Sequence, residues 1–158
     1  MKRVFLGLGT NMGDRQQNLA DAIDALAKKV EILRRSSVYE TKAWGYTEQA
    51  DFLNMVVEAR TELKPLALLN FLKRTESELG RVANFRYGPR VIDIDILFYE
   101  DLVRNTPRLQ IPHPRLHERA FVLVPMVELA ADLTHPILNR SMSELLKDVD
   151  GQEVRLCE

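Results

Sequence analysis

Hydrophobic positions along the first part of the chain follow two different spacings. Residues 4–8 form a short apolar run that ends at Gly9, and this run predicts a buried strand. Apolar side chains then recur every three or four residues from Leu19 to Val30, which predicts a helix. The chain therefore begins with a strand that is followed by a helix.

The next part of the chain repeats this order with one additional strand. Residues 31–39 and 52–60 are rich in β-branched and aromatic side chains, and a polar loop separates them, so we predict two antiparallel strands. A second helix is predicted from Pro65, which suits a first helical turn, to Gly80, which suits a helix end. Residues 91–98 alternate as a fourth strand.

The order strand, helix, strand, strand, helix, strand predicts an α+β fold. It is the βαββαβ pattern of ferredoxin-like cores, in which helices cover one face of an antiparallel sheet and leave the other face available for ligands. Helices near 117–131 and 141–148 and a last strand at 153–157 are predicted to follow as a C-terminal helical extension that wraps the core. We expect residues 1–158 to form a single domain.

Composition and charge exclude several classes of function. The 22 Lys and Arg nearly balance the 23 Asp and Glu, so no global positive field is available to hold a nucleic acid. No apolar run is long enough to span a membrane, and the single cysteine, Cys157, has no intrachain partner for a disulfide. We expect a cytoplasmic protein that acts on small molecules as a monomer or weak dimer.

The glycines at the end of the first predicted strand suggest dinucleotide binding but do not complete its motif. Gly7-Leu8-Gly9 would need a small residue at position 12, and that residue is Met12. No Gly-Lys-Ser or Gly-Lys-Thr follows, so the phosphate-binding loop of P-loop enzymes is missing as well. We interpret Gly7, Gly9 and Gly13 as permissive backbone positions at a tight turn.

Two carboxylates share one face of the fourth predicted strand. Because side chains alternate along a strand, Asp93 and Asp95 point the same way, about 6 to 7 Å apart. The core-facing positions are then Ile92, Ile94, Ile96 and Phe98. A solvated strand face would explain an isolated pair of this kind, but divalent cations also favour paired carboxylates, and Mg²⁺ prefers oxygen ligands.

Basic residues immediately upstream strengthen the metal interpretation. Arg81, Arg86 and Arg90 surround Gly88-Pro89, so groups that bind anions and groups that bind cations lie within one loop and one strand. A metal–polyphosphate complex needs both kinds of group, and phosphoryl transfer depends mainly on positioning and charge neutralisation. The alternative is that these arginines lie on a solvated loop.

The stretch from Arg86 to Leu97 resembles the signature of the 6-hydroxymethyl-7,8-dihydropterin pyrophosphokinases. Three further blocks are similar to the same family, in the same order: residues 7–14, 41–54 and 111–128. The resemblance implies a ferredoxin-like fold and diphosphate transfer from ATP to 6-hydroxymethyl-7,8-dihydropterin in folate biosynthesis. In this family ATP is the co-substrate and two Mg²⁺ ions bridge its phosphates.

The resemblance also implies roles for individual residues. Asp93 and Asp95 match the ligands of the two Mg²⁺ ions and, with Arg81, Arg86 and Arg90, the catalytic group. The positions assigned to ATP contacts are Lys73, Glu76, Tyr87, Arg90, Ile96, Arg108, His113 and Arg119, and Lys73 departs from the polar glutamine that relatives can have there. The positions that match the pterin pocket are Thr41, Lys42, Trp44, Gly45, Phe52, Asn54 and Phe121.

The residues alone support part of the pterin assignment. Phe52 and Asn54 are two apart on a predicted strand, so a flat ring stacked on the first could pair its amide edge with the second. Without the resemblance, Phe52 and Phe121 would be interpreted as ordinary core residues. Nothing in the sequence marks a general base.

Two other classes of function compete with an enzyme. A ferredoxin-like regulatory module could bind a small ligand without chemistry, but it would have no reason to assemble Arg90 with Asp93 and Asp95. A sheet that binds RNA would present basic and aromatic side chains where this strand presents carboxylates.

Overall fold

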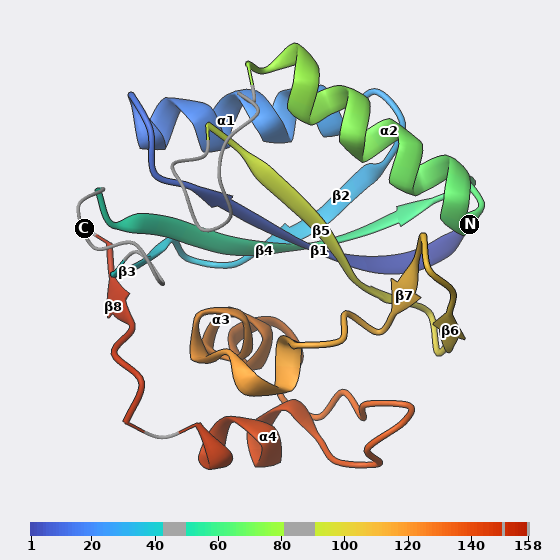
Figure 1. Cartoon of the computed structure of the whole chain (residues 1–158). Helices are drawn as coiled ribbons and strands as arrows, with labels where there is room; N and C mark the ends of the chain where they lie inside the picture. The colour runs from blue at the N-terminus through green and yellow to red at the C-terminus, as the bar shows by residue number, and fades with distance from the viewer. Residues whose placement is uncertain (43–49, 81–90, 150, 158) are drawn as a thin grey trace.

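The computed structural model describes residues 1–42, 50–80, 91–149 and 151–157. An antiparallel sheet forms the middle layer, and its strands lie in the order β5-β1-β4-β3-β8, with β2 also paired to β4 (Figure 1). The strands are β1 (Lys2–Thr10), β2 (Glu31–Arg35), β3 (Tyr39–Thr41), β4 (Phe52–Thr61), β5 (Asp93–Tyr99) and β8 (Arg155–Leu156). A separate two-stranded ribbon joins β6 (Arg104–Asn105) to β7 (Gln110–Ile111).

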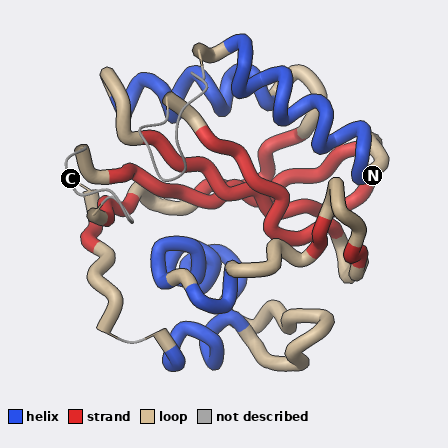
Figure 2. Tube along the Cα trace, in the orientation of Figure 1, coloured by secondary structure: helices blue, strands red, loops and turns tan. Residues whose placement is uncertain are grey.

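Helices lie on both faces of the sheet (Figure 2). The helices α1 (Arg15–Leu26) and α2 (Pro65–Glu78) cover one face. On the other side lie the short 3₁₀ helix η1 (Leu116–Glu118), α3 (Ala120–Ala130), which packs on the sheet, and α4 (Met142–Asp148), which packs on α3. The expectation that this second face stays open is therefore wrong in part, because the apolar side of α3 packs on it.

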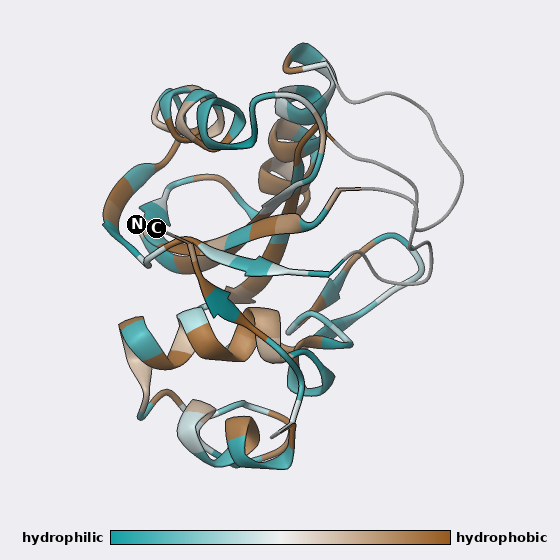
Figure 3. Cartoon of the chain, turned by 90° about the vertical axis from the view of Figure 1, so that its left-hand side faces the viewer, coloured by the Kyte–Doolittle hydropathy of each residue, from teal (hydrophilic) through white to brown (hydrophobic). Residues whose placement is uncertain are grey.

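Two apolar clusters hold these three layers together. The first joins α1 and α2 to the sheet through residues such as Leu6, Leu26 and Leu72, all of which are fully buried. The second joins α3 and α4 to the opposite face through residues such as Phe5 and Leu123. Figure 3 shows the apolar strands between helical layers whose outward sides are hydrophilic. None of the described helices is long and apolar enough to cross a membrane.

Several predicted elements form close to where the pattern placed them, although α1 begins and ends earlier than the apolar spacing from Leu19 to Val30 indicated. Pro65 opens α2, and Gly80 follows its end with a φ of 94°. The Asp14 side chain accepts a hydrogen bond from the Gln17 N–H and so caps the start of α1. Ser141 and Glu144 form a reciprocal capping box at the start of α4.

Other elements differ from the prediction at points where the chain changes direction. The strand expected at 31–39 is divided into β2 and β3, because Ser36 leaves the regular ladder and its hydroxyl accepts the Val56 N–H at 2.9 Å. The helix expected at 117–131 is divided into η1 and α3. Only two residues of the segment 153–157 pair as β8, and the sequence analysis did not predict β6 and β7.

A β-bulge in β5 corrects the predicted orientation of Phe98. In the pairing with β1, Phe98 lies opposite Phe5 and Ile96 lies opposite Leu6, so Leu97 is the extra residue. Phe98 was expected to face α1 and α2 with the isoleucines. It packs instead in the second cluster, with its ring 6.2 Å from that of Phe5.

Polar contacts tie α3 to the sheet. The carboxylate of Glu58 accepts hydrogen bonds from Arg3 at 2.6 Å and from Arg34 at 2.7 Å, and Arg34 also donates to the Leu129 carbonyl in α3. Burial raises the pKa of Glu58, but the hydrogen bonds from Arg34 and Arg3 outweigh it and leave that pKa below its ordinary value. Glu58 therefore remains ionised between its two arginines.

We expect Glu58→Gln to lower the free energy of unfolding near neutral pH by about 1 to 3 kcal/mol, since it weakens two charge-assisted hydrogen bonds to a buried group. The folded-state pKa is depressed, so this stability is present above the ordinary value of 4.5 and is lost as pH falls through the folded value. Denaturant unfolding between pH 3 and pH 7 measures the difference.

The matched control is Glu31→Gln, which removes a more exposed cross-strand pair with Arg60 in the same sheet. An exposed pair contributes less than about 1 kcal/mol, so this variant should remain close to the parent. A Glu58→Gln penalty that does not shrink towards acid pH would contradict the assignment.

Candidate active site

The candidate site is built on the part of the sheet face that α3 leaves uncovered. In the pairing of β5 with β1 and of β1 with β4, Gly9 lies opposite both Asp93 and Asn54. Neighbouring strands are about 5 Å apart, so the carboxylate and the amide lie in one row, about 10 Å apart along the sheet. The next row of the same face joins Asp95, Gly7 and Val56.

Gly7 and Gly9 form the floor between these two columns of side chains. The interpretation of these two glycines as a tight turn is wrong, because both lie inside β1, and among the glycines that the structure describes positive φ occurs only at Gly13, Gly80 and Gly151. A Cβ atom on Gly9 would lie 3.2 Å from the Asn54 amide oxygen. The absence of side chains at these positions leaves room for a ligand against the backbone. For Gly13, with a φ of 66°, the turn interpretation holds.

A cavity of about 640 Å³ opens over this floor and is lined by the described residues that were predicted to bind pterin. These are Thr41, Lys42, Phe52, Asn54 and Phe121. Asp93, Asp95, His113 and Arg119 line the same cavity. The structure therefore brings together the predicted pterin group, the acidic pair and two of the residues predicted to contact ATP.

A second cavity of about 260 Å³ adjoins the outer side of β5. Lys73, Ile96 and Arg108, all predicted to contact ATP, line it. Asp95 and His113 line both cavities, so these two residues lie where the cavities meet. A ligand in one cavity and a ligand in the other would approach each other there.

Hydrogen bonds fix the polar edge of the larger cavity. The Asn54 amide nitrogen donates to the Thr41 hydroxyl at 3.0 Å, and both residues are buried. This bond orients the amide so that its oxygen lies next to Gly9. Arg119 lies over the Phe121 ring at 5.5 Å from its centroid, at the wall that α3 contributes.

His113 is held as a neutral imidazole. Burial lowers its pKa, the charge of Asp95 opposes that shift, and the positive charges of Arg119 and Arg115 add to it, so the pKa lies below 6.5. Its Nδ1 atom accepts the Arg115 N–H at 3.2 Å, which places the proton of the neutral ring on Nε2. The backbone N–H of His113 donates to the Leu97 carbonyl at 3.0 Å, and this hydrogen bond attaches the loop that carries His113 to β5.

Glu76, on α2, contacts the backbone of β5 between the two aspartates. Its buried carboxylate accepts the Ile94 N–H at 2.8 Å and lies 3.3 Å from the Lys73 ammonium. Glu76 does not line either of these two cavities. Through Ile94 it fixes the segment of β5 that carries Asp93 and Asp95. Arg108, by contrast, contacts Asn70 on α2 at the smaller cavity.

The donor chemistry of the site fits Mg²⁺. Asp93 and Asp95 present two carboxylates to one cavity, and oxygen is the ligand that Mg²⁺ prefers. Among the residues that the structure describes, no group of three or more acidic, histidine or cysteine side chains is placed to hold a metal. The remaining ligands would have to come from phosphate oxygens and water, as is usual for Mg²⁺ in nucleotide sites.

Six predicted site residues lie outside the described ranges. They are Trp44, Gly45, Arg81, Arg86, Tyr87 and Arg90. Conversely, the sequence analysis missed Gly7 and Gly9 as a floor and residues 152–154 as a wall of the larger cavity. Alternation along β1 could have identified the glycines, because they share the face of Phe5.

Comparisons with known proteins point to one family. The sequence pattern of the family described as 7,8-dihydro-6-hydroxymethylpterin-pyrophosphokinase (HPPK) matches residues 5–131. A 2-amino-4-hydroxy-6-hydroxymethyldihydropteridine pyrophosphokinase of Aquifex aeolicus is 46% identical over 91% of this chain and 90% of its own length. One of the same name from Bacillus subtilis is 44% identical over 80% of this chain and 77% of its own.

Solved structures share the fold. A crystal structure described as HPPK-DHPS in complex with substrates has a TM-score of 0.74 at 16% identity, over 93% of this chain and 43% of that one. Plasmodium falciparum HPPK-DHPS, solved with SDX-DHP, has a TM-score of 0.72 at 18% identity, over 94% of this chain and 43% of that one. This chain thus spans less than half the length of those proteins.

Fold, site and sequence define the chain as a pyrophosphokinase. It belongs to the 7,8-dihydro-6-hydroxymethylpterin-pyrophosphokinase family.

Proposed function

We propose that this chain transfers the terminal diphosphate of ATP to the hydroxymethyl group of 6-hydroxymethyl-7,8-dihydropterin, giving AMP and the pterin diphosphate in folate synthesis. The observation that carries the proposal is that Asp95 and His113 line both cavities. A pterin in the larger cavity and ATP in the smaller one would meet at these residues. Family membership supports this pair of substrates.

The larger cavity suits a flat heterocycle with a polar edge. Phe52 and Phe121 line it and offer ring faces for stacking, while Asn54 and Thr41 offer buried hydrogen-bonding groups. Lys42 lies at the same cavity, and we propose that Trp44 and Gly45 complete the pocket.

We propose that the smaller cavity holds ATP. Lys73, Ile96, Arg108 and His113 line it, and Arg119 stands beside His113 at the larger one. Glu76 would contribute by fixing β5 beneath these groups. Arg81, Arg86, Tyr87 and Arg90 would contact the nucleotide from the segment that precedes β5, where the arginines would offset phosphate charge.

Asp93 and Asp95 would hold two Mg²⁺ ions together with phosphate oxygens of ATP. When bound, the ions would neutralise charge that develops on the transferring diphosphate. The chain itself would position the two reactants, one in each cavity.

The reaction would be an in-line displacement at the β-phosphorus of ATP. The pterin hydroxymethyl oxygen forms a bond to that phosphorus as the bond to the oxygen bridging the α-phosphate breaks, and the electron pair leaves with AMP. The hydroxyl proton is released, and we assign no residue as its base. The Nε2–H of neutral His113 can donate a hydrogen bond to a departing oxygen without adding charge.

The wider setting is part of the same proposal. We propose that residues 1–158 act as one domain with a ferredoxin-like βαββαβ core, to which α3 and α4 are a C-terminal extension. The sheet order β5-β1-β4, in which β2 and β3 both pair with β4 on the side away from β1, supports this. We propose that the chain works in the cytoplasm as a monomer or weak dimer, without nucleic acid or membrane partners.

The direct test is incubation with ATP, Mg²⁺ and the dihydropterin. Formation of AMP in equal amount to pterin diphosphate supports the proposal. ADP as the product, or binding without turnover, would instead favour a simple kinase or a regulatory module.

We expect Asp95→Asn, and likewise Asp93→Asn, to lower kcat/KM by about 100-fold or more, a loss of about 2.7 kcal/mol in transition-state stabilisation. Each variant removes a carboxylate from a strand face that tolerates polar groups, so circular dichroism and thermal unfolding should match the parent. Asp101→Asn, in the exposed turn after β5, is the control and should keep full activity. Near-normal Mg²⁺-dependent turnover in either site variant would disprove the metal assignment.

We expect Gly9→Ala to weaken pterin binding by about 1 to 3 kcal/mol, because the added methyl group would press on the Asn54 oxygen and occupy the floor. Gly7→Ala is the matched control in the same strand. Its methyl group would meet Leu97 at 3.4 Å, an ordinary contact, and its effect should be smaller. Calorimetric titration with pterin compares them, and equal affinities for Gly9→Ala and the parent would place the ligand elsewhere.

We expect Asn54→Leu to weaken pterin binding by about 1 to 3 kcal/mol while ATP affinity hardly changes, because a ligand amide would lose its buried partner. Phe121→Ala should also weaken binding, but through lost stacking, so its penalty should be similar for purines and pterins. Calorimetry with both ring systems separates the two effects. Pterin affinity that is unaltered by Asn54→Leu would show that the pocket is assigned wrongly.

A further inference from the structure

The last described residues of the chain form one wall of the larger cavity. Gln152, Glu153 and Val154 line it, in the stretch that leads to β8 at the edge of the sheet (Figure 1). They follow the residues 5–131 that match the family pattern, and neither motif nor spacing assigned them a role. Val154 is partly buried and packs against the apolar cluster that includes Leu123 of α3.

Two sets of hydrogen bonds hold this segment across the opening. At one end, the Gln152 amide accepts the Ala120 N–H at 2.9 Å and donates to the Glu118 carbonyl at 2.9 Å, so it bridges η1 and the start of α3. At the other end, β8 pairs with β3, and the Cys157 N–H donates to the Val38 carbonyl at 2.8 Å. The segment is therefore attached to both sides of the cavity.

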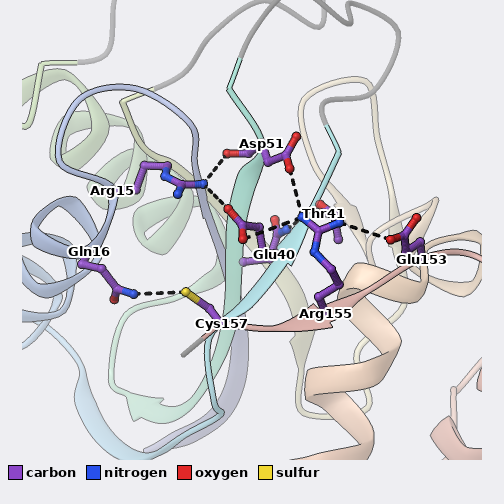
Figure 4. A network of polar contacts seen from close by, with 9 residues as sticks. Arg15, Gln16, Glu40, Thr41, Asp51, Glu153, Arg155 and Cys157 are labelled. Carbon is purple, nitrogen blue, oxygen red and sulfur yellow. Dashed lines mark hydrogen bonds and ion pairs between the residues drawn. The ribbon is translucent and has the colours of Figure 1, made fainter.

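Arg155 connects this segment to the strands that carry pterin-pocket residues. Its guanidinium lies 2.9 Å from the Asp51 carboxylate, 3.3 Å from that of Glu153 and 3.7 Å from that of Glu40 (Figure 4). Arg15, at the start of α1, lies 2.7 Å from the other Glu40 oxygen and donates to the Asp51 carbonyl. Two arginines thus join the end of β3 to the start of β4.

The residues held in this way adjoin pocket residues. Thr41 follows Glu40, Phe52 follows Asp51, and Thr41 and Phe52 lie opposite each other in the pairing of β3 with β4. Arg155 has 39% of its side chain exposed and Glu40 has 26%, so solvent weakens each ion pair. The hold on Glu40 and Asp51 therefore depends on the ion pairs acting together. Displacing Glu40 or Asp51 would move the adjacent pocket residue.

We propose that residues 152–154 form a wall of the pterin pocket and that the adjacent Arg155 is a positioning residue, which sets the spacing of Thr41 and Phe52 through Glu40 and Asp51. The inference rests on the proposed function of the larger cavity. Val154 supplies an apolar contact to the ligand at this wall. Pterin affinity therefore depends on a segment that does not touch the smaller cavity.

The test compares KM for pterin, KM for ATP and kcat in the parent and in Arg155→Ala. We expect KM for pterin to rise about fivefold, the size of effect that loss of a partly exposed ion-pair network gives, with KM for ATP and kcat nearly unchanged. Arg155→Lys, which keeps the charge, should recover part of the loss. Arg140→Ala is the control, since Arg140 is similarly exposed and pairs with Asp148 on α4.

A second variant guards against loss of folding in the first. Val154→Ala keeps every ion pair and should raise KM for pterin about two- to threefold through lost apolar contact. An unchanged KM for pterin in both Arg155→Ala and Val154→Ala, with an active parent, would overturn the inference and leave the proposed function intact. An equal rise for pterin and ATP would also overturn it. A parent that does not use the pterin would overturn the proposed function itself.

Discussion

The register of β1 against its two neighbours is the constraint on which the rest of the site depends. Because Gly9 lies opposite both Asp93 and Asn54, the strand without side chains separates an acidic column from a column that can recognise a heterocycle. A shift by one residue in either pairing would turn these side chains towards α1 and α2. The Glu76 carboxylate accepts the Ile94 N–H at 2.8 Å, so it holds the β5 backbone between the two aspartates and helps to fix that register.

Patterns with a strict period could be read from the sequence. The shared face of Asp93 and Asp95 follows from alternation alone, and the first turn of α2 follows from Pro65. The glycine floor could be read only in part: alternation places Gly7 and Gly9 on the face of Phe5, but only the pairing of β1 with β4 and β5 shows that Gly9 separates Asn54 from Asp93. Phe98 was misassigned because the extra residue in β5 is visible only in its pairing with β1.

The position of the segment 152–156 could not be predicted from the sequence for a different reason. Only two of its residues pair as a strand, so hydrophobic periodicity has too short a window to indicate a position. Its placement depends on contacts with residues far away in the chain, namely Glu118, Glu40 and Asp51. Partners at such sequence distances are set by the tertiary fold, whereas the motif residues of β5 are close neighbours in the chain.

The bulge at Leu97 turns both ends of the short strand β5 towards the same side of the sheet. On one side of it, β5 presents carboxylates to the cavities, and on the other side it presents the Phe98 ring to the layer of α3 and α4 on the same face of the sheet. A regular strand would have sent that ring to the opposite layer. One extra residue thus lets the acidic end and the aromatic end of β5 serve the same side of the sheet within seven consecutive positions, and its carbonyl also anchors the loop that carries His113.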